Sequence, residues 1–240
     1  MKQTGRYLAI LILVVALWNT VVMKPLKIFA VFLHELGHSL MAVVFGNGIQ
    51  GFRINLDESG YALTLPKSTF SAFMIANGGY LGSVLFALLI LYLKRTALKK
   101  FILGTAAILL LGVSIAYGKS VFTIIYAAVF AGFVLLLYML HNEKINDWVI
   151  DIIGVACAAY AVYDTFVDTI LLQLNLRLHW IQGWKTVQPQ TDAVQLQQMT
   201  HVPAMLWGLL WLVIACLAIY SVIATGGRRP AGTRGKKRAM

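Results

Sequence analysis

Long apolar runs constrain this chain more than any other feature of its sequence. Of its 240 residues, 60% are hydrophobic and only 12% are charged. A helix needs about 20 apolar residues to cross a hydrocarbon core of about 30 Å. Seven segments reach or approach that length, at about residues 7–23, 28–46, 69–93, 101–117, 120–140, 148–172 and 203–224. We therefore predict an all-α polytopic membrane protein with about seven transmembrane helices.

The connections between these runs leave no room for a sizeable soluble domain, so residues 1–225 are expected to form a single membrane-embedded domain. The first run lacks a small-residue cleavage site, and we interpret it as an uncleaved span rather than a signal peptide. Residues 226–240 are basic, contain Gly and Pro, and are predicted to be disordered. Cys157 and Cys216 both fall in apolar runs, which disfavours a disulfide framework.

Residues 48–67, between the second and third runs, are the least membrane-like part of this domain. Two short strand-like stretches flank a turn at Glu58-Ser59-Gly60, which predicts a β-hairpin. Such a hairpin can be an ordinary surface feature. Alternatively, its edge strand can hold an extended peptide by main-chain pairing. Both interpretations stay open at the level of the sequence.

Residues 34–38 read His-Glu-Leu-Gly-His inside the second apolar run. On a helix His34 and His38 lie one turn apart on the same face, where both imidazoles can bind one Zn²⁺. Glu35 lies beside them and can take a proton from a water that the metal activates. Ionisable groups in hydrocarbon are costly unless something compensates them, and a metal does so. We predict one Zn²⁺ per chain, with Glu35 as the catalytic base.

A zinc peptidase needs a third protein ligand and leaves the fourth position to water. The sixth run carries Asp164 and Asp168, which share one helix face. The two histidines lie roughly 15 Å from the end of their run, Asp164 roughly 13 Å and Asp168 roughly 7–8 Å. Depth therefore favours Asp164 as the third ligand, with Asp168 beside it or at the entrance. Both aspartates could instead line a polar cavity or bind something else.

The third run is expected to cross the membrane in the opposite direction to the second. It contains the stretch Asn77-Gly78-Gly79-Tyr80-Leu81-Gly82. Asn77 reaches a depth of roughly 13 Å. Its amide could donate to a developing oxyanion or to a substrate carbonyl, so we predict it as a second catalytic residue. The three glycines permit a close approach of two backbones and favour helix packing.

These motifs resemble the site-2 protease superfamily of intramembrane zinc metallopeptidases, in its small branch without a PDZ domain. The resemblance is carried by residues 32–38, the hairpin-like segment and residues 77–83, with further similarity at 163–168 and 191–208. It spans roughly residues 28–215, and only the zinc motif in it is sharply diagnostic. The superfamily's usual Leu-Asp-Gly around the third ligand is absent from this sequence.

The resemblance implies a zinc metalloendopeptidase that cleaves membrane-anchored protein substrates within the lipid bilayer, as in regulated intramembrane proteolysis. It makes His34 and His38 zinc ligands, Glu35 the base and an aspartate on a later span the third ligand. Asp192, in a polar loop, could cap a helix or approach the site. Two other classes stay open: a metal or proton transporter that uses these side chains as an ion path, and a noncatalytic membrane chaperone or scaffold derived from a protease.

The net charge of +11 is distributed in a way that predicts topology rather than nucleic-acid binding. With seven spans, residues 24–27, 94–100, Lys144 and the tail lie on one side, which holds 13 Lys and Arg against 7. The positive-inside rule makes that side cytoplasmic. The hairpin is then extracytoplasmic, whereas the resemblance implies an active site near the cytosolic face. The short loops favour a prokaryotic cell membrane.

Overall fold

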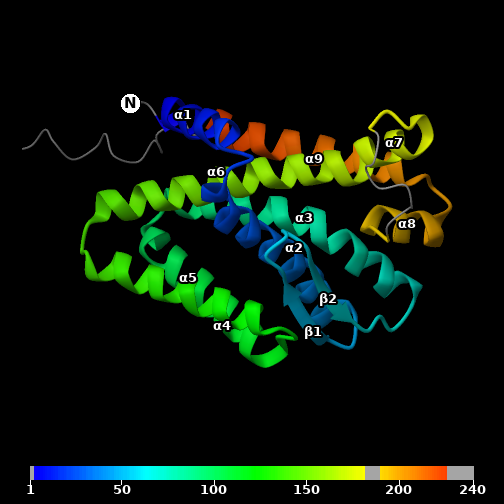
Figure 1. Cartoon of the computed structure of the whole chain (residues 1–240), viewed down its shortest axis with the longest axis horizontal. Helices are drawn as coiled ribbons and strands as arrows, with labels where there is room; N and C mark the ends of the chain where they lie inside the picture. The colour runs from blue at the N-terminus through cyan, green and yellow to red at the C-terminus, as the bar shows by residue number, and fades with distance from the viewer. Residues whose placement is uncertain (1–2, 182–189, 226–240) are drawn as a thin grey trace, which may run out of the picture.

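The computed structural model describes residues 3–181 and 190–225, with side chains as far as Ser221. The predicted disordered tail, 226–240, lies outside the described residues. Most helices run roughly along the longest axis of the molecule, and a two-stranded sheet lies beside one of them (Figure 1). This arrangement confirms the predicted helical membrane protein with a small hairpin.

Six helical segments among the described residues are long and apolar enough to cross a membrane. They are α2 (Lys24–Phe45) with the 3-10 turn η1 (Val21–Met23) before it, α3 (Thr69–Leu93), α4 (Ile102–Tyr117) with η2 (Ala97–Phe101) before it, α5 (Val121–Met139), α6 (Glu143–Thr165) continued by the π-helical η3 (Phe166–Leu171) and by α7 (Leu172–Leu178), and α9 (Ala204–Thr225). Polar residues start three of them: the side chains of Ser68, Ser120 and Asn142 cap α3, α5 and α6.

The first apolar run differs from the prediction. Its helix α1 (Gln3–Ala16) has 14 residues, or about 21 Å at 1.5 Å per residue, which is less than the thickness of the hydrocarbon core. The helix ends at Ala16 and a turn follows it, beyond which the Thr20 hydroxyl donates to the Leu17 carbonyl at 2.7 Å. Such side chains compete for backbone hydrogen bonds and end helices. The structure thus has six candidate spans where about seven were predicted.

A buried ion cluster fixes α1 to the bundle. The Asp151 carboxylate on α6 is fully buried. It lies 2.5 Å from the Arg6 guanidinium of α1 and also pairs with the Lys94 ammonium at the end of α3. The start of α1, the end of α3 and the start of α6 therefore lie at the same end of the molecule.

The hairpin consists of β1 (Ile49–Ile54) and β2 (Gly60–Thr64), paired antiparallel. The outer edge of β1 is occupied. The Lys119 backbone N–H donates to the Phe52 carbonyl at 2.9 Å. The Thr123 hydroxyl of α5 accepts from the Ile54 N–H at 3.1 Å and donates to the Ile54 carbonyl at 3.2 Å. Among the described residues, β2 pairs only with β1, so its outer edge has no strand beside it.

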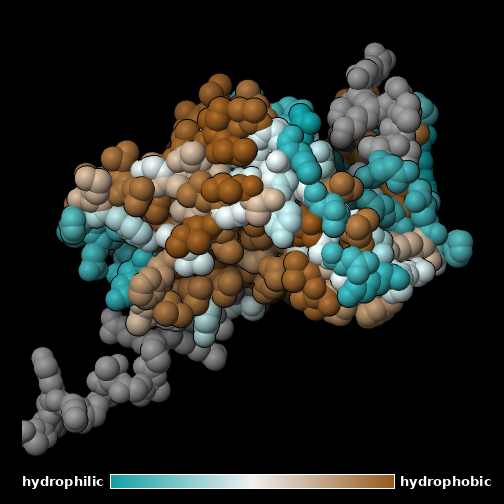
Figure 2. Space-filling view, turned by 90° about the horizontal axis from the view of Figure 1, so that it is seen from below, coloured by the Kyte–Doolittle hydropathy of each residue, from teal (hydrophilic) through white to brown (hydrophobic). Residues whose placement is uncertain are grey.

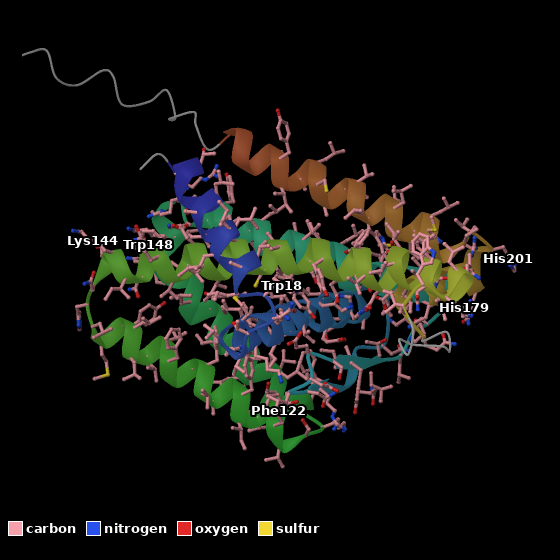
Figure 3. All side chains as sticks on the ribbon, turned by 45° about the horizontal axis from the view of Figure 1, so that its top comes forward. Trp18, Phe122, Lys144, Trp148, His179 and His201 are labelled. Atoms are coloured by element: carbon pink, nitrogen blue, oxygen red, sulfur yellow. The ribbon has the colours of Figure 1, made fainter. Side chains whose placement is uncertain are left out.

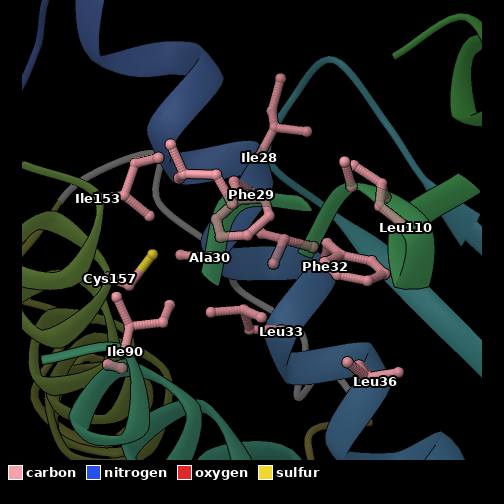
Figure 4. Packing of buried hydrophobic residues seen from close by; sticks show 14 of the residues in the cluster. Ile28, Phe29, Ala30, Phe32, Leu33, Leu36, Ile90, Leu110, Ile153 and Cys157 are labelled. Atoms are coloured by element: carbon pink, nitrogen blue, oxygen red, sulfur yellow. The ribbon is translucent and has the colours of Figure 1, made fainter. Parts of the chain in front are cut away.

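The core is centred on α2. Its apolar side chains pack between α3, α4, α5 and α6, as Figure 4 shows for Phe29, Phe32 and Leu33. The Phe29 ring stacks on Phe130 of α5 with centroids 4.8 Å apart. On the other face α2 meets α3 backbone to backbone, because a Cβ on Gly82 would lie 2.8 Å from the Cα of Gly37. Gly82 therefore has the packing role that the sequence suggested.

The outer surface is apolar over the middle of the molecule and hydrophilic towards its ends (Figure 2). Val129 and Leu135 of α5 are 65% and 63% exposed. Exposed apolar surface on this scale is what a bilayer covers. Together with the six candidate spans, it makes this an integral membrane protein.

Candidate metal centre

The two histidines of the His-Glu-Leu-Gly-His motif lie on one face of α2, as predicted from their spacing. Their Nε2 atoms are 3.2 Å apart. The His34 ring packs edge-on against Tyr80 of α3, with ring centroids 4.8 Å apart. The uninterrupted helix of α2 thus holds both imidazoles towards α3, with one nitrogen of each close to the other.

The residue that completes this group is Asp192, the first residue of α8 (Asp192–Thr200). Its Oδ2 lies 3.3 Å from His34 Nε2 and 3.1 Å from His38 Nε2. Among the described residues, these three form the group of His, Cys, Asp or Glu side chains whose ligand atoms could hold a metal ion. The sequence left the position of Asp192 open and predicted Asp164 in its place.

The geometry of this triangle fits a zinc ion. Ligands about 2.1 Å from Zn²⁺ in a tetrahedral arrangement lie about 3.4 Å from one another, and the three separations here are 3.1, 3.2 and 3.3 Å. Two imidazoles and a carboxylate are ligands that zinc accepts. The Asp192 Oδ2 atom is buried and has no hydrogen-bond donor among the described residues. A cation is the partner that such an oxygen lacks.

Gly79 of α3 leaves the space in front of the triangle open. A Cβ at this position would lie 2.5 Å from the Nε2 atoms of both histidines and 2.7 Å from Asp192 Oδ2. A side chain at residue 79 would therefore occupy the place where an ion touches all three ligands. The sequence suggested helix packing for Gly79, whereas the structure puts it against the ligand atoms.

Neighbouring groups orient two of the ligands. The Nδ1 atom of His38 is 2.7 Å from the Ile75 carbonyl, an acceptor, so Nδ1 carries the proton and Nε2 keeps its lone pair for a metal. Burial raises the pKa of the Asp192 carboxyl, and the positive charge of protonated His38 and His34 beside it more than offsets that rise. A metal ion at the same place would supply the positive charge when both imidazoles are neutral.

Glu35 and the ligands face a common cavity of about 520 Å³. Its walls come from α2, from the hairpin, from α3, from α6 with η3, and from the start of α8. Glu35 is only 7% exposed. A Cβ at Gly60 would lie 3.1 Å from the Glu35 Cγ, so the hairpin lies directly against the glutamate.

The model of the Peptidase M50B-like family matches residues 7–222. The chain belongs to this family. It is the site-2 protease family of membrane metallopeptidases, and membership confirms the resemblance found in the sequence. No curated protein and no solved structure matches the chain significantly.

Within the fold of this Peptidase M50B-like chain, Asp164 and Asp168 also line the cavity. Asp164 lies in the last turn of α6 and Asp168 in η3. Neither belongs to the group of ligand atoms around His34 and His38. Asp164 thus lines the same cavity as the two histidines, whereas α8 brings the carboxylate of Asp192, rather than the predicted Asp164, into the group of ligand atoms.

Asn77 is the other predicted site residue that the structure does not bring to the ligands. Its side-chain oxygen accepts from the Trp211 indole of α9 at 3.0 Å, and its amide donates to the Phe73 carbonyl at 2.9 Å. These two hydrogen bonds join α3 to α9, and Asn77 is not among the residues that line the cavity. Its predicted catalytic role stays a prediction.

The remaining histidines of the Peptidase M50B-like chain lie elsewhere. His179 and His201 follow the ends of α7 and α8 and lie together at one end of the molecule (Figure 3). His141 lies in the turn between α5 and α6, next to Lys144 at the opposite end. The sequence argument that no third histidine is well placed agrees with these positions.

Proposed function

We propose that this chain is an intramembrane zinc metalloendopeptidase that hydrolyses peptide bonds of membrane-tethered protein substrates. One observation carries the proposal: His34, His38 and Asp192 direct three ligand atoms to one point, and Glu35 faces the same cavity. His34, His38 and Asp192 would hold the ion. When bound, zinc supplies a Lewis acid for the scissile carbonyl and lowers the pKa of the attacking water.

Glu35 has the position of a general acid–base residue. Its carboxylate accepts a proton from the attacking water and then delivers that proton to the nitrogen of the leaving amine. It lies one residue from a ligand on the same helix and is almost fully buried. Burial in a water-poor site strengthens each electrostatic interaction that forms as the peptide bond breaks.

The hairpin provides a means of presenting the substrate. Gly60, Tyr61, Ala62 and Thr64 of β2 line the cavity, on the side of Glu35. Since the far edge of β1 is occupied by Lys119 and Thr123, the unpaired edge is that of β2. An extended peptide that pairs with β2 satisfies its own backbone and passes beside the glutamate. A transmembrane substrate helix must unwind locally to do this.

The test uses purified protein in proteoliposomes with a library of single-span substrates. We expect one zinc per chain in the wild type by elemental analysis. Glu35→Gln keeps the zinc and loses cleavage by at least about 100-fold, because general acid–base catalysis contributes about that much or more. His34→Ala loses both zinc and cleavage. Full activity of Glu35→Gln rules out this mechanism.

The same preparations separate the two other classes. A metal or proton transporter would show metal-dependent uptake into the vesicles, and that uptake would not require Glu35 as a base. A noncatalytic scaffold would keep its cellular role in Glu35→Gln. We expect tightly bound zinc, no metal-dependent uptake into the vesicles, and cleavage that depends on Glu35.

A further inference from the structure

The two histidines of the metal centre are held in different ways. The Nδ1 atom of His38 lies 2.7 Å from the Ile75 carbonyl, and this hydrogen bond fixes the orientation of the ring. The Nδ1 atom of His34 is buried and has no hydrogen-bond partner among the described residues. Metal-ligating histidines almost always use their second nitrogen for such a bond, because it sets the ring orientation. Something else must therefore orient the His34 ring.

Aromatic packing orients the His34 ring instead. The ring lies edge-on to Tyr80 of α3, with centroids 4.8 Å apart and planes at 86°. Tyr80 in turn stacks on the indole of Trp211 of α9, with centroids 4.8 Å apart and planes at 28°. Edge-to-face and stacked pairs at such distances are the arrangements that aromatic rings prefer. The three rings therefore form a continuous aromatic column from α9 to the ligand.

A single hydrogen bond fixes the far end of this aromatic column. Trp211 is 1% exposed, and its indole N–H donates to the Asn77 side-chain oxygen at 3.0 Å. The Asn77 amide donates to the Phe73 carbonyl, one turn earlier on α3, at 2.9 Å. This second bond turns the Asn77 oxygen towards the indole. Because a buried N–H that loses its acceptor is costly, the bond to Asn77 determines where Trp211 lies.

The same packing carries the third ligand. Ala193 follows Asp192 directly in the chain and is fully buried, in one hydrophobic cluster with Tyr80 and Trp211. Leu196 of α8 belongs to this cluster as well. The position of the Asp192 carboxylate therefore depends on the packing around Trp211. Two of the three ligands depend on it in this way.

Packing alone explains the pair of Asn77 and Trp211 poorly. A polar side chain inside a membrane-spanning helix is costly, and an apolar pair would join α3 to α9 without that cost. A buried polar pair whose groups are all hydrogen-bonded does, however, rigidify its surroundings and specify one arrangement. Neither residue lines the cavity, so the pair acts on the site through the side chains between them.

We propose that Asn77 and Trp211 are positioning residues of the metal centre. Their hydrogen bond fixes the aromatic column that orients the His34 ring, and it fixes the packing that brings Asp192 to the two histidines. The inference rests on the proposed zinc site and adds two residues to it that lie outside the cavity. Both residues act on the affinity for the metal rather than on the chemical step.

The experiment measures the zinc affinity of the full chain in detergent, by competition with a chromogenic chelator. Asn77→Leu removes the acceptor, Trp211→Phe removes the donor but keeps an aromatic ring, and a double variant combines both changes. We expect each single variant to bind zinc about 10- to 100-fold more weakly, as other groups that support metal ligands do. Because both changes break the same hydrogen bond, the double variant should be little worse than either single one.

The matched control is Trp148→Phe, which removes an indole from the start of α6 (Figure 3), next to Arg6. It should bind zinc like the wild type. A second readout separates positioning from a general loss of stability. The visible absorption of Co²⁺ bound in place of zinc reports the geometry of its ligands. We expect this spectrum to change in both single variants while circular dichroism shows the helix content of the wild type.

The outcomes distinguish this inference from the proposed function. A wild type that binds no zinc overturns both. Unchanged zinc affinity and an unchanged cobalt spectrum in the folded variants overturn the positioning role and leave the zinc site standing. Additive losses in the double variant, or an equal loss in the control, overturn it as well, because the effect would then not come from this hydrogen bond. If Asn77→Leu does not fold, Trp211→Phe alone decides, since it keeps a ring in the column.

Discussion

At the scale of single residues, Gly79 shows how a missing side chain can leave room for the proposed metal ion. The nearest atoms to a Cβ at this position are the three ligand atoms of His34, His38 and Asp192, all within 2.7 Å. An ion can contact all three ligand atoms only if no other group fills the space between them. The glycine is thus required by the site rather than by helix packing alone.

Gly79→Ala is therefore predicted to abolish tight zinc binding while the helical bundle stays folded. The three atoms nearest to the added methyl group are side-chain atoms of the site, so it displaces an ion before it displaces a helix. Elemental analysis and circular dichroism measure both effects. Gly112→Ala is the matched control, because a Cβ there has no heavy atom within 4 Å. A stoichiometric zinc content in Gly79→Ala would contradict this role.

Asp192 and Asp164 make opposite predictions for the third ligand. Asp192→Ala removes one corner of the triangle, and we expect zinc affinity to fall by at least about 100-fold, because even groups that only support a ligand are worth 10- to 100-fold. Asp164→Ala should keep the zinc of the wild type. Competition with a chromogenic chelator measures both affinities. The reverse outcome would restore Asp164 as the ligand that the sequence predicted.

The sequence made part of this site predictable, for a physical reason. His34, Glu35 and His38 lie within one helical turn, so their spacing alone determines their arrangement. Asp192 comes from a separate short helix, and its approach depends on tertiary packing of α8 against α3 that no local pattern encodes. Depth could rank Asp164 against Asp168, but it carries no information on which helix faces which.

At the scale of elements, one threonine ties the hairpin to the membrane helices. Thr123 of α5 is fully buried, and its hydroxyl serves both the N–H and the carbonyl of Ile54. The side chain thereby takes the place of a neighbouring strand. Because the hairpin forms the wall next to Glu35, this contact also helps to position β2.

Thr123→Val is predicted to lower the free energy of unfolding by about 2 kcal/mol, since it removes the partner of two buried backbone groups without a large change in volume. Thermal unfolding in detergent measures the loss. Thr105→Val, at an exposed position of α4, is the control and should be nearly neutral. An unchanged stability of Thr123→Val would mean that the hairpin is held mainly by β2 and α2.

Element prediction succeeded where the pattern was local. The turn residues around Ser59 correctly predicted the hairpin, and the long apolar runs correctly predicted six spans. The first run gave a helix of only 14 residues, because hydropathy averages over the polar residues Asn19 and Thr20 and so overlooks the turn that follows Ala16. The π-helical turn η3 was not predictable either, since its sequence Phe-Val-Asp-Thr-Ile-Leu carries no signal that separates it from an α-helix.

At the scale of the whole molecule, the short α1 strengthens the charge asymmetry. The ion cluster with Asp151 places Arg6 at the end that carries Lys94, and α9 ends beside the start of α1 (Figure 1). Six described Lys and Arg lie at that end, and six more follow α9 in the sequence. The first six are Arg6, Lys94, Arg95, Lys99, Lys100 and Lys144. The described loops and helix ends on the opposite side carry Arg53, Lys67, Lys119 and Arg177.

By the positive-inside rule, this distribution predicts that the hairpin and the metal centre open to the extracytoplasmic side. Single cysteines at Lys119 and Lys144 test it in a background that lacks Cys157 and Cys216. Both lysines are exposed; Lys119 lies between α4 and α5, and Lys144 lies in the first turn of α6, at the opposite end of α5. In intact bacterial cells a membrane-impermeant maleimide should label Lys119→Cys and spare Lys144→Cys, which reacts only after lysis. The opposite labelling would place the site at the cytosolic face, as the family resemblance implied, and would require twelve or more basic residues to lie outside the cell.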